Sequence, residues 1–140
     1  EAQAGAHSGP VFDLKVIGGS AMARQDPGEP YCRIDSHEAS SMMDAEPGGT
    51  VVVDVRREDE WVTGHVSGAI HIPVDDLTDR MDEVPRDMKV LFICAIGVRS
   101  GLACEIAAAM GYNTENLYNI EDGTPAWISG DYPTSYGDGP

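Results

Sequence analysis

The segment Lys89–Tyr112, "KVLFICAIGVRSGLACEIAAAMGY", decides the fold of this chain. It starts with "KVLFI", a run of large apolar residues that is typical of a fully buried strand in a parallel sheet. Cys94 follows this run, and a turn that contains Gly97 then leads into an alanine-rich pattern. That pattern predicts a helix over residues 100–110 that ends at Gly111. A strand, a short loop and a helix in this order are typical of an α/β domain.

Strands and helices alternate on both sides of this segment. Thr50–Val55 ("TVVVDV") predicts a second buried strand, and "AIHIP" and "NLYNI" predict two shorter ones. Helices are predicted in the segments between the strands: "SHEASSMMDAE" with Ser36 as the N-cap, "REDEWVTG", "PVDDLTDRMDEVP" and "GTPAWISG". This alternation predicts a parallel sheet with helices packed against it.

The 140 residues are enough for one ordinary domain. Residues 1–30 are rich in Gly, Ala, Pro and polar residues, so we expect an N-terminal tail or linker there. The domain itself is predicted over residues 31–133, and residues 134–140 are predicted to form a C-terminal tail. The first residue is Glu rather than Met, which fits either a processed product or a piece of a longer protein.

The charge of the chain is strongly negative, with 24 acidic and nine basic residues and a formal net charge of −15. A field of this sign repels phosphates, so nucleic acids and anionic membranes are not expected as partners. The same composition is typical of a highly soluble protein or of one adapted to a salty milieu. The charge therefore bears on partners and solubility, and not on the fold.

Neither a membrane-spanning run of about 18 apolar residues nor a basic-then-apolar leader occurs in the sequence. Three cysteines, Cys32, Cys94 and Cys104, match no zinc or CxxC spacing, and their odd number favours reducing surroundings over a disulfide scaffold. We therefore expect a cytoplasmic protein without a metal or an organic cofactor. A periplasmic location and a place within a larger chain stay open.

Cys94 stands where a ligand is expected in such a fold. Ligands of parallel α/β sheets bind beyond the carboxyl ends of the strands, where loops lead into helix N-termini. There, loop N–H groups and the positive end of the helix stabilise a thiolate, the nucleophilic form of cysteine. Gly97 lets the loop turn, Arg99 adds a positive charge, and Ser100 either caps the helix or donates its hydroxyl to the sulfur. The alternative is that Cys94 is only a small buried residue at the end of a strand.

Three motifs in this order resemble the single-domain rhodanese family: "DVR" followed by "E..W..GH..GA..IP", the loop "CAIGVRS", and "DGTPAW". The resemblance implies an α/β rhodanese fold, with a five-stranded, mostly parallel sheet and helices on both faces. It also implies sulfur transfer through a persulfide on Cys94. The persulfide would be held by the N–H groups of the loop residues Ala95, Ile96, Gly97, Val98, Arg99 and Ser100.

The length of this loop separates two kinds of chemistry. Four residues lie between Cys94 and Arg99, whereas cell-cycle dual-specificity phosphatases, which use a related scaffold, carry five. The longer loop makes a wider ring of N–H groups, which fits a tetrahedral phosphate. The shorter loop suits a single sulfur atom, so the count favours a sulfurtransferase over a phosphatase or an arsenate reductase.

Further residues match family positions outside the loop. Asp54 and Arg56 in "DVR" are expected either to support the loop structurally or to contact the substrate anion. His65 is expected to tie a loop together rather than to catalyse, and Trp127 is expected in the core. Asp122 in "DGTPAW" replaces the first of two glycines that are common in the family, and Asp tolerates a left-handed backbone better than most residues.

The predicted function is the transfer of a sulfane sulfur from a small sulfur-containing anion or a persulfide donor to a nucleophilic acceptor. The acceptor would be cyanide, a thiol or a protein. Ala95 and Ile96 are apolar, whereas relatives that use thiosulfate efficiently often carry a cationic or hydroxyl group there, so the loop does not favour thiosulfate as the physiological donor. The alternative function is a rhodanese-like binding or sulfur-relay module of a larger protein, with little activity of its own.

Overall fold

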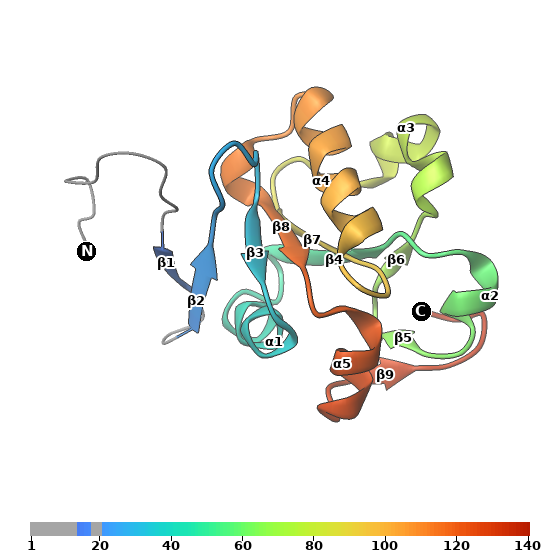
Figure 1. Cartoon of the computed structure of the whole chain (residues 1–140). Coiled ribbons are helices and arrows are strands. Elements are labelled where there is room, and N and C mark those ends of the chain that lie inside the picture. Colours follow the sequence, from blue (N-terminus) through green and yellow to red (C-terminus); the bar gives the residue numbers. More distant parts are fainter. Residues whose placement is uncertain (1–13, 18–20) are drawn as a thin grey trace.

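The computed structural model describes residues 14–17 and 21–140, and the main sheet of this part of the chain has seven strands in the order β1-β2-β3-β8-β7-β4-β6 (Figure 1). All neighbours from β3 to β6 in this order run parallel. The parallel strands are β3 (Cys32–Ile34), β8 (Leu117–Ile120), β7 (Lys89–Ile93), β4 (Thr50–Asp54) and β6 (Ile70–His71). They confirm the predicted five-stranded parallel sheet.

Both predicted tails contain strands. β1 (Leu14–Ile17) and β2 (Ala21–Arg24) pair antiparallel, and β2 joins the main sheet beside β3. β9 (Thr134–Ser135) pairs antiparallel with β5 (His65–Val66) in a second, two-stranded sheet. The expectation for residues 1–13 and 18–20 lies outside the described residues, and the domain limits of 31–133 stay a prediction.

Helices cover both faces of the main sheet (Figure 1). α1 (Ser36–Ala45) and α5 (Gly123–Ser129) lie on one face, whereas α3 (Leu77–Arg80) and α4 (Val98–Ala109) lie on the other. The short α2 (Glu58–Trp61) follows the carboxyl end of β4. The predicted α/β architecture is therefore confirmed.

The residues of β7 alternate between two cores, because successive side chains of a strand point to opposite faces of the sheet. Leu91 and Ile93 belong to the apolar cluster that includes residues of α1 and α5. Val90, Phe92 and Cys94 belong to the cluster that includes residues of α3 and α4. Cys94 therefore leaves the sheet on the α4 side, directly before the loop that starts this helix.

The N-terminus of α1 differs from the prediction, because its N-cap is Asp35 and not Ser36. The Asp35 carboxylate accepts the N–H of Glu38 at 2.8 Å, and the Glu38 carboxylate accepts the N–H of Asp35 at 2.7 Å. This reciprocal capping box satisfies two N–H groups at once, which a cap at Ser36 would not do.

Two further helices differ in extent from their predictions. The helix expected over residues 100–110 begins at Val98, directly after the left-handed Gly97. The helix predicted from "PVDDLTDRMDEVP" is divided into the 3₁₀ turns Val74–Asp76 and Met81–Glu83 on either side of α3. Within residues 14–17 and 21–140, no helix has the length and apolar character that crossing a bilayer requires.

Candidate active site

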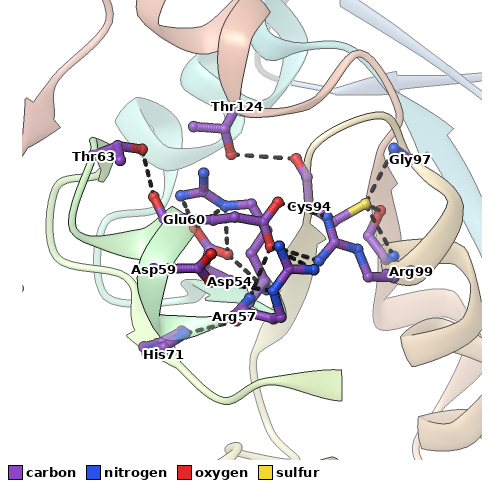
Figure 2. A network of polar contacts seen from close by, with 12 residues as sticks. Asp54, Arg57, Asp59, Glu60, Thr63, His71, Cys94, Gly97, Arg99 and Thr124 are labelled. Atoms are coloured by element: carbon purple, nitrogen blue, oxygen red, sulfur yellow. Dashed lines mark hydrogen bonds and ion pairs between the residues drawn. The ribbon is translucent and has the colours of Figure 1, made fainter. Parts of the chain in front are cut away.

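The sulfur of Cys94 lies in the loop between β7 and α4, where several hydrogen-bond donors point at it (Figure 2). The N–H of Gly97 lies 3.1 Å from Sγ, and the N–H of Ser100 lies 3.4 Å from it. The Ser100 hydroxyl oxygen is 3.2 Å from the same sulfur. Because Cys94 is 0% exposed, bulk water does not compete with these groups.

Two opposing effects set the pKa of Cys94. Burial alone raises it, because a thiolate loses its hydration inside the protein. The Ser100 hydroxyl and the N–H groups of Ser100, Ile96 and Gly97 lower it, because they bond to the charged form. The hydrogen bonds prevail, and the pKa of Cys94 lies below the usual value of a thiol. The geometry therefore favours the nucleophilic thiolate.

Asn119 of β8 connects the Ser100 hydroxyl to the backbone of the loop. The hydroxyl donates to Asn119 Oδ1 at 2.6 Å, and Asn119 Nδ2 donates to the Gly97 carbonyl at 3.0 Å. A Cβ on Gly97, which has φ 90°, would lie 2.7 Å from the Glu121 carbonyl oxygen, so glycine is needed there. The sequence did not single out Asn119, although an amide in a strand as buried as "LYNI" must find hydrogen-bond partners.

The "DGTPAW" motif holds the start of the loop from the other side. The N–H and the hydroxyl of Thr124 donate to the Cys94 carbonyl at 2.9 and 3.2 Å (Figure 2). Gly123 has φ 77°, and a Cβ on it would overlap the Ala95 carbonyl. Asp122 has φ −81°, so the left-handed backbone that we expected at Asp122 lies at Gly123 instead.

The positive charge that we expected from Arg99 is paired with a carboxylate. Its two terminal nitrogens donate to the two carboxylate oxygens of Glu60 at 2.7 and 2.9 Å (Figure 2). This bidentate pair is the main cause that lowers the pKa of Glu60 to about 2. Glu60 stays ionised at neutral pH, and its carboxylate balances the charge of Arg99. The side chain of Arg99 thereby ties α4 to α2.

Comparison with known proteins shows to which family the chain belongs. The chain matches the family described as "Rhodanese-like domain" over residues 35–129. It belongs to the rhodanese-like family. A protein named sulfurtransferase from Allochromatium vinosum is 32% identical over 94 residues, which are 67% of this chain and 85% of the relative. Thiosulfate sulfurtransferase GlpE from Pseudomonas entomophila is 31% identical over 81 residues, which are 58% of this chain and 72% of that protein.

A solved structure is similar to this rhodanese-like domain over most of its length. It is that of a rhodanese-related protein from Thermoplasma volcanium, and the TM-score is 0.62 at 29% sequence identity. The similarity covers 74% of this chain and 96% of the Thermoplasma volcanium chain. Sequence and fold together identify a rhodanese-type protein whose named relatives include sulfurtransferases.

Asp54 and Arg56 form a buried ion pair in this rhodanese-like domain, at 0% and 4% exposure. Arg56 Nη2 donates to Asp54 Oδ2 at 2.8 Å and to the Gly64 carbonyl at 2.9 Å. The backbone N–H of Arg56 donates to Asp54 Oδ1 at 3.0 Å. Because protein acceptors hold this guanidinium, the geometry favours structural support over contact with a substrate anion.

His65 lies between α2 and the C-terminal segment of the rhodanese-like domain. Its Nδ1 is 2.8 Å from the Trp61 carbonyl oxygen, and its Nε2 is 2.6 Å from the Gly139 carbonyl oxygen. The imidazole stacks on the indole of Trp61, with the ring centroids 3.4 Å apart. Both ring nitrogens therefore face backbone carbonyls, which suits a structural role.

The other two cysteines, Cys32 and Cys104, are buried, and neither of them is in a disulfide. Burial raises the pKa of Cys104 well above its usual value, so this thiol stays protonated and unreactive. Among the described residues, no group of three or more His, Cys, Asp or Glu side chains could hold a metal ion. Cys94 is therefore the group in this site whose surroundings favour nucleophilic attack.

Proposed function

We propose that this rhodanese-like protein is a sulfurtransferase that carries a sulfane sulfur as a persulfide on Cys94. The observation that carries the proposal is the set of groups around Cys94 Sγ, namely two N–H groups at 3.1 and 3.4 Å and a hydroxyl at 3.2 Å. The two N–H groups are fixed donors, which stabilise a sulfur anion without any movement of the protein. We infer that the N–H groups of Ala95 to Ser100 together receive the outer sulfur of the persulfide.

Each half of the reaction breaks one sulfur–sulfur bond and forms one new bond to the transferred sulfur. The Cys94 thiolate attacks the outer sulfur of a donor such as thiosulfate, and the bond between the two donor sulfurs breaks, so that sulfite leaves with the electron pair. An acceptor nucleophile then attacks the outer sulfur of the Cys94 persulfide, and the electron pair of the broken bond returns to Cys94. Neither half transfers a proton, which suits a site that is built from fixed hydrogen-bond donors.

Intact-mass spectrometry tests this proposal directly. After incubation with thiosulfate and removal of the excess, we expect the protein to gain about 32 Da, the mass of one sulfur atom. Cyanide should remove this mass, and Cys94→Ala should never acquire it. Absence of any gain from thiosulfate and from a persulfide donor, in a sample that is folded by circular dichroism, would exclude the enzyme and favour a binding module.

The salt dependence of the thiosulfate:cyanide reaction is a second expected outcome. With a net charge of −15, the protein repels a dianion, and Arg99 offers no free countercharge because Glu60 pairs with it. Physiological salt shortens the Debye length to about 8 Å and screens this repulsion. We therefore expect kcat/KM for thiosulfate to be low at low ionic strength and to rise as KCl is added. A steep fall with added salt would contradict this account.

A further inference from the structure

A hollow of about 420 Å³ lies beside the active-site loop, and the chemistry described above does not use it. Its volume falls within the roughly 300–1,000 Å³ that is usual for ligand sites, and it is far too large for a single sulfur atom. Gly97 lines the hollow, and the N–H of the same residue lies 3.1 Å from Cys94 Sγ. The hollow therefore adjoins the loop that holds the nucleophile, although Cys94 itself is buried and is not among the lining residues.

One side of the hollow is apolar and exposed. Ile96, Val98 and Leu102 line it, with 75%, 71% and 50% of their surfaces accessible. The loop does not need these side chains to hold the sulfur, because backbone N–H groups donate to it and the Ser100 hydroxyl lies beside it. Three large aliphatic side chains gathered on the surface of so acidic a protein are typical of a contact site.

The rest of the lining is negatively charged on balance. Three carboxylates, Glu29, Glu105 and Glu121, face the hollow, with Arg33 as the cation among its lining residues. Arg33 is bound by both Glu29 and Glu121, and Glu121 also pairs with Arg24. Within the described part of the chain, Glu105 forms no ion pair. A ligand that matches this lining carries positive charge next to an apolar group.

We propose that this hollow docks a sulfur-accepting protein at a segment where a cysteine lies between apolar and basic residues. An apolar side chain of the segment covers Ile96, Val98 and Leu102, and a lysine or arginine faces Glu105. The cysteine between them then lies next to the loop that holds the persulfide. This proposal rests on the proposed function and names the class of acceptor for the same site.

The transfer is balanced without any further reagent. The thiolate of the docked cysteine attacks the outer sulfur of the Cys94 persulfide and forms a new S–S bond. The bond between that sulfur and Cys94 Sγ breaks, and its electron pair stays on Cys94 as the thiolate. The partner leaves as a persulfide anion, so the total charge is unchanged and no oxidant or reductant is consumed.

Three short peptides can stand in for the acceptor. Their sequences are acetyl-Lys-Leu-Cys-Leu-Lys-amide, the acidic acetyl-Glu-Leu-Cys-Leu-Glu-amide and the polar acetyl-Lys-Ser-Cys-Ser-Lys-amide. The protein is first loaded with sulfur, and the loss of about 32 Da is then followed by mass spectrometry with each peptide and with cyanide. We expect the first peptide to remove the sulfur fastest. Each variant is compared with the wild type on the same peptide, so differences in thiol reactivity between peptides cancel.

Two surface variants separate docking from chemistry. Glu105→Lys replaces an attraction by a repulsion and should lower the rate of sulfur transfer to the basic apolar peptide about tenfold. Leu102→Asn should lower this rate about fivefold. Neither change should slow the removal of sulfur by cyanide. Glu115→Lys makes the same charge change at an exposed residue outside the hollow and should alter the peptide rate less than about twofold.

The outcomes of this test are distinguishable. The docking site would be supported if Glu105→Lys and Leu102→Asn lose the preference for the basic apolar peptide and Glu115→Lys keeps it. In these variants cyanide must still remove the sulfur at the wild-type rate. Equal effects of Glu105→Lys on all three peptides, or equal effects of Glu105→Lys and Glu115→Lys, would overturn it while leaving the proposed function in place. Failure of the wild-type protein to load sulfur would overturn both proposals.

Discussion

Replacing Gly123 with alanine is expected to slow persulfide formation on Cys94 by about 100-fold or more, the effect of an ångström-scale displacement of a reacting group. A Cβ on Gly123 would overlap the Ala95 carbonyl and lie 3.0 Å from the Cys94 carbonyl oxygen. The start of the loop must therefore move away from Thr124, which holds that carbonyl. The sulfur then loses its alignment with its donors, and the pKa of Cys94 rises. The rate of mass gain and the pH profile of alkylation by iodoacetamide measure both effects.

The matched control is Gly68→Ala. Gly68 has φ 83°, close to the 77° of Gly123, but a Cβ on it would meet nothing within 4 Å. The substitution carries the same backbone penalty, about 1–2 kcal/mol, without any contact with the loop. It should lower stability by that amount and leave the alkylation profile unchanged. The same profile in the wild type and in Gly123→Ala would show that this contact does not position the loop.

Replacing Asp54 with alanine is expected to lower the free energy of unfolding by about 3–5 kcal/mol, because it leaves a buried charge without its partner. Arg56 is 4% exposed and would keep only the Gly64 carbonyl among its side-chain acceptors. A loss of this size is a large part of the total stability of about 5–15 kcal/mol that is usual for a domain. Urea unfolding followed by circular dichroism measures it.

Two companion variants test this explanation. Asp59 pairs with Arg57 on the surface, where the two side chains are 72% and 69% exposed, so Asp59→Ala should change stability by less than about 1 kcal/mol. The double variant Asp54→Ala/Arg56→Leu should recover part of the loss, because it leaves no unpaired charge in the interior. A loss from Asp54→Ala no larger than that from Asp59→Ala would contradict the role of burial.

The elements that the sequence predicted are those that local patterns determine. β7 follows from the apolar run "KVLFI", and the end of α4 follows from Gly111, which has φ 95°. Such signals act within a few residues, so they can be read without knowledge of the fold. The run "KVLFI" also placed Cys94 at the end of β7. Loops at the carboxyl ends of parallel strands hold ligands, so this position indicated a functional site.

The features that the sequence did not predict depend on residues that are far apart along the chain. Glu60 and Arg99 are separated by 39 positions, and nothing near either residue indicates the other. Asn119 reaches Ser100 across 19 positions for the same reason. The strands at Leu14–Ile17 and Ala21–Arg24 were missed because their flanks have the composition of a linker, while pairing with the edge of the sheet decides their conformation.

Because Arg99 is paired with Glu60, the reactivity of the Cys94 thiol does not depend on the charges at the protein surface. With this guanidinium already matched, the groups that bond to the Cys94 sulfur are backbone amides and a hydroxyl, all of them electrically neutral. Dissolved ions shield charges over several ångströms of water, but they do not reach between a buried sulfur and donors in contact with it. Carboxylates on the protein surface can therefore be added or removed, in evolution or by engineering, while the reactivity of the thiol stays the same.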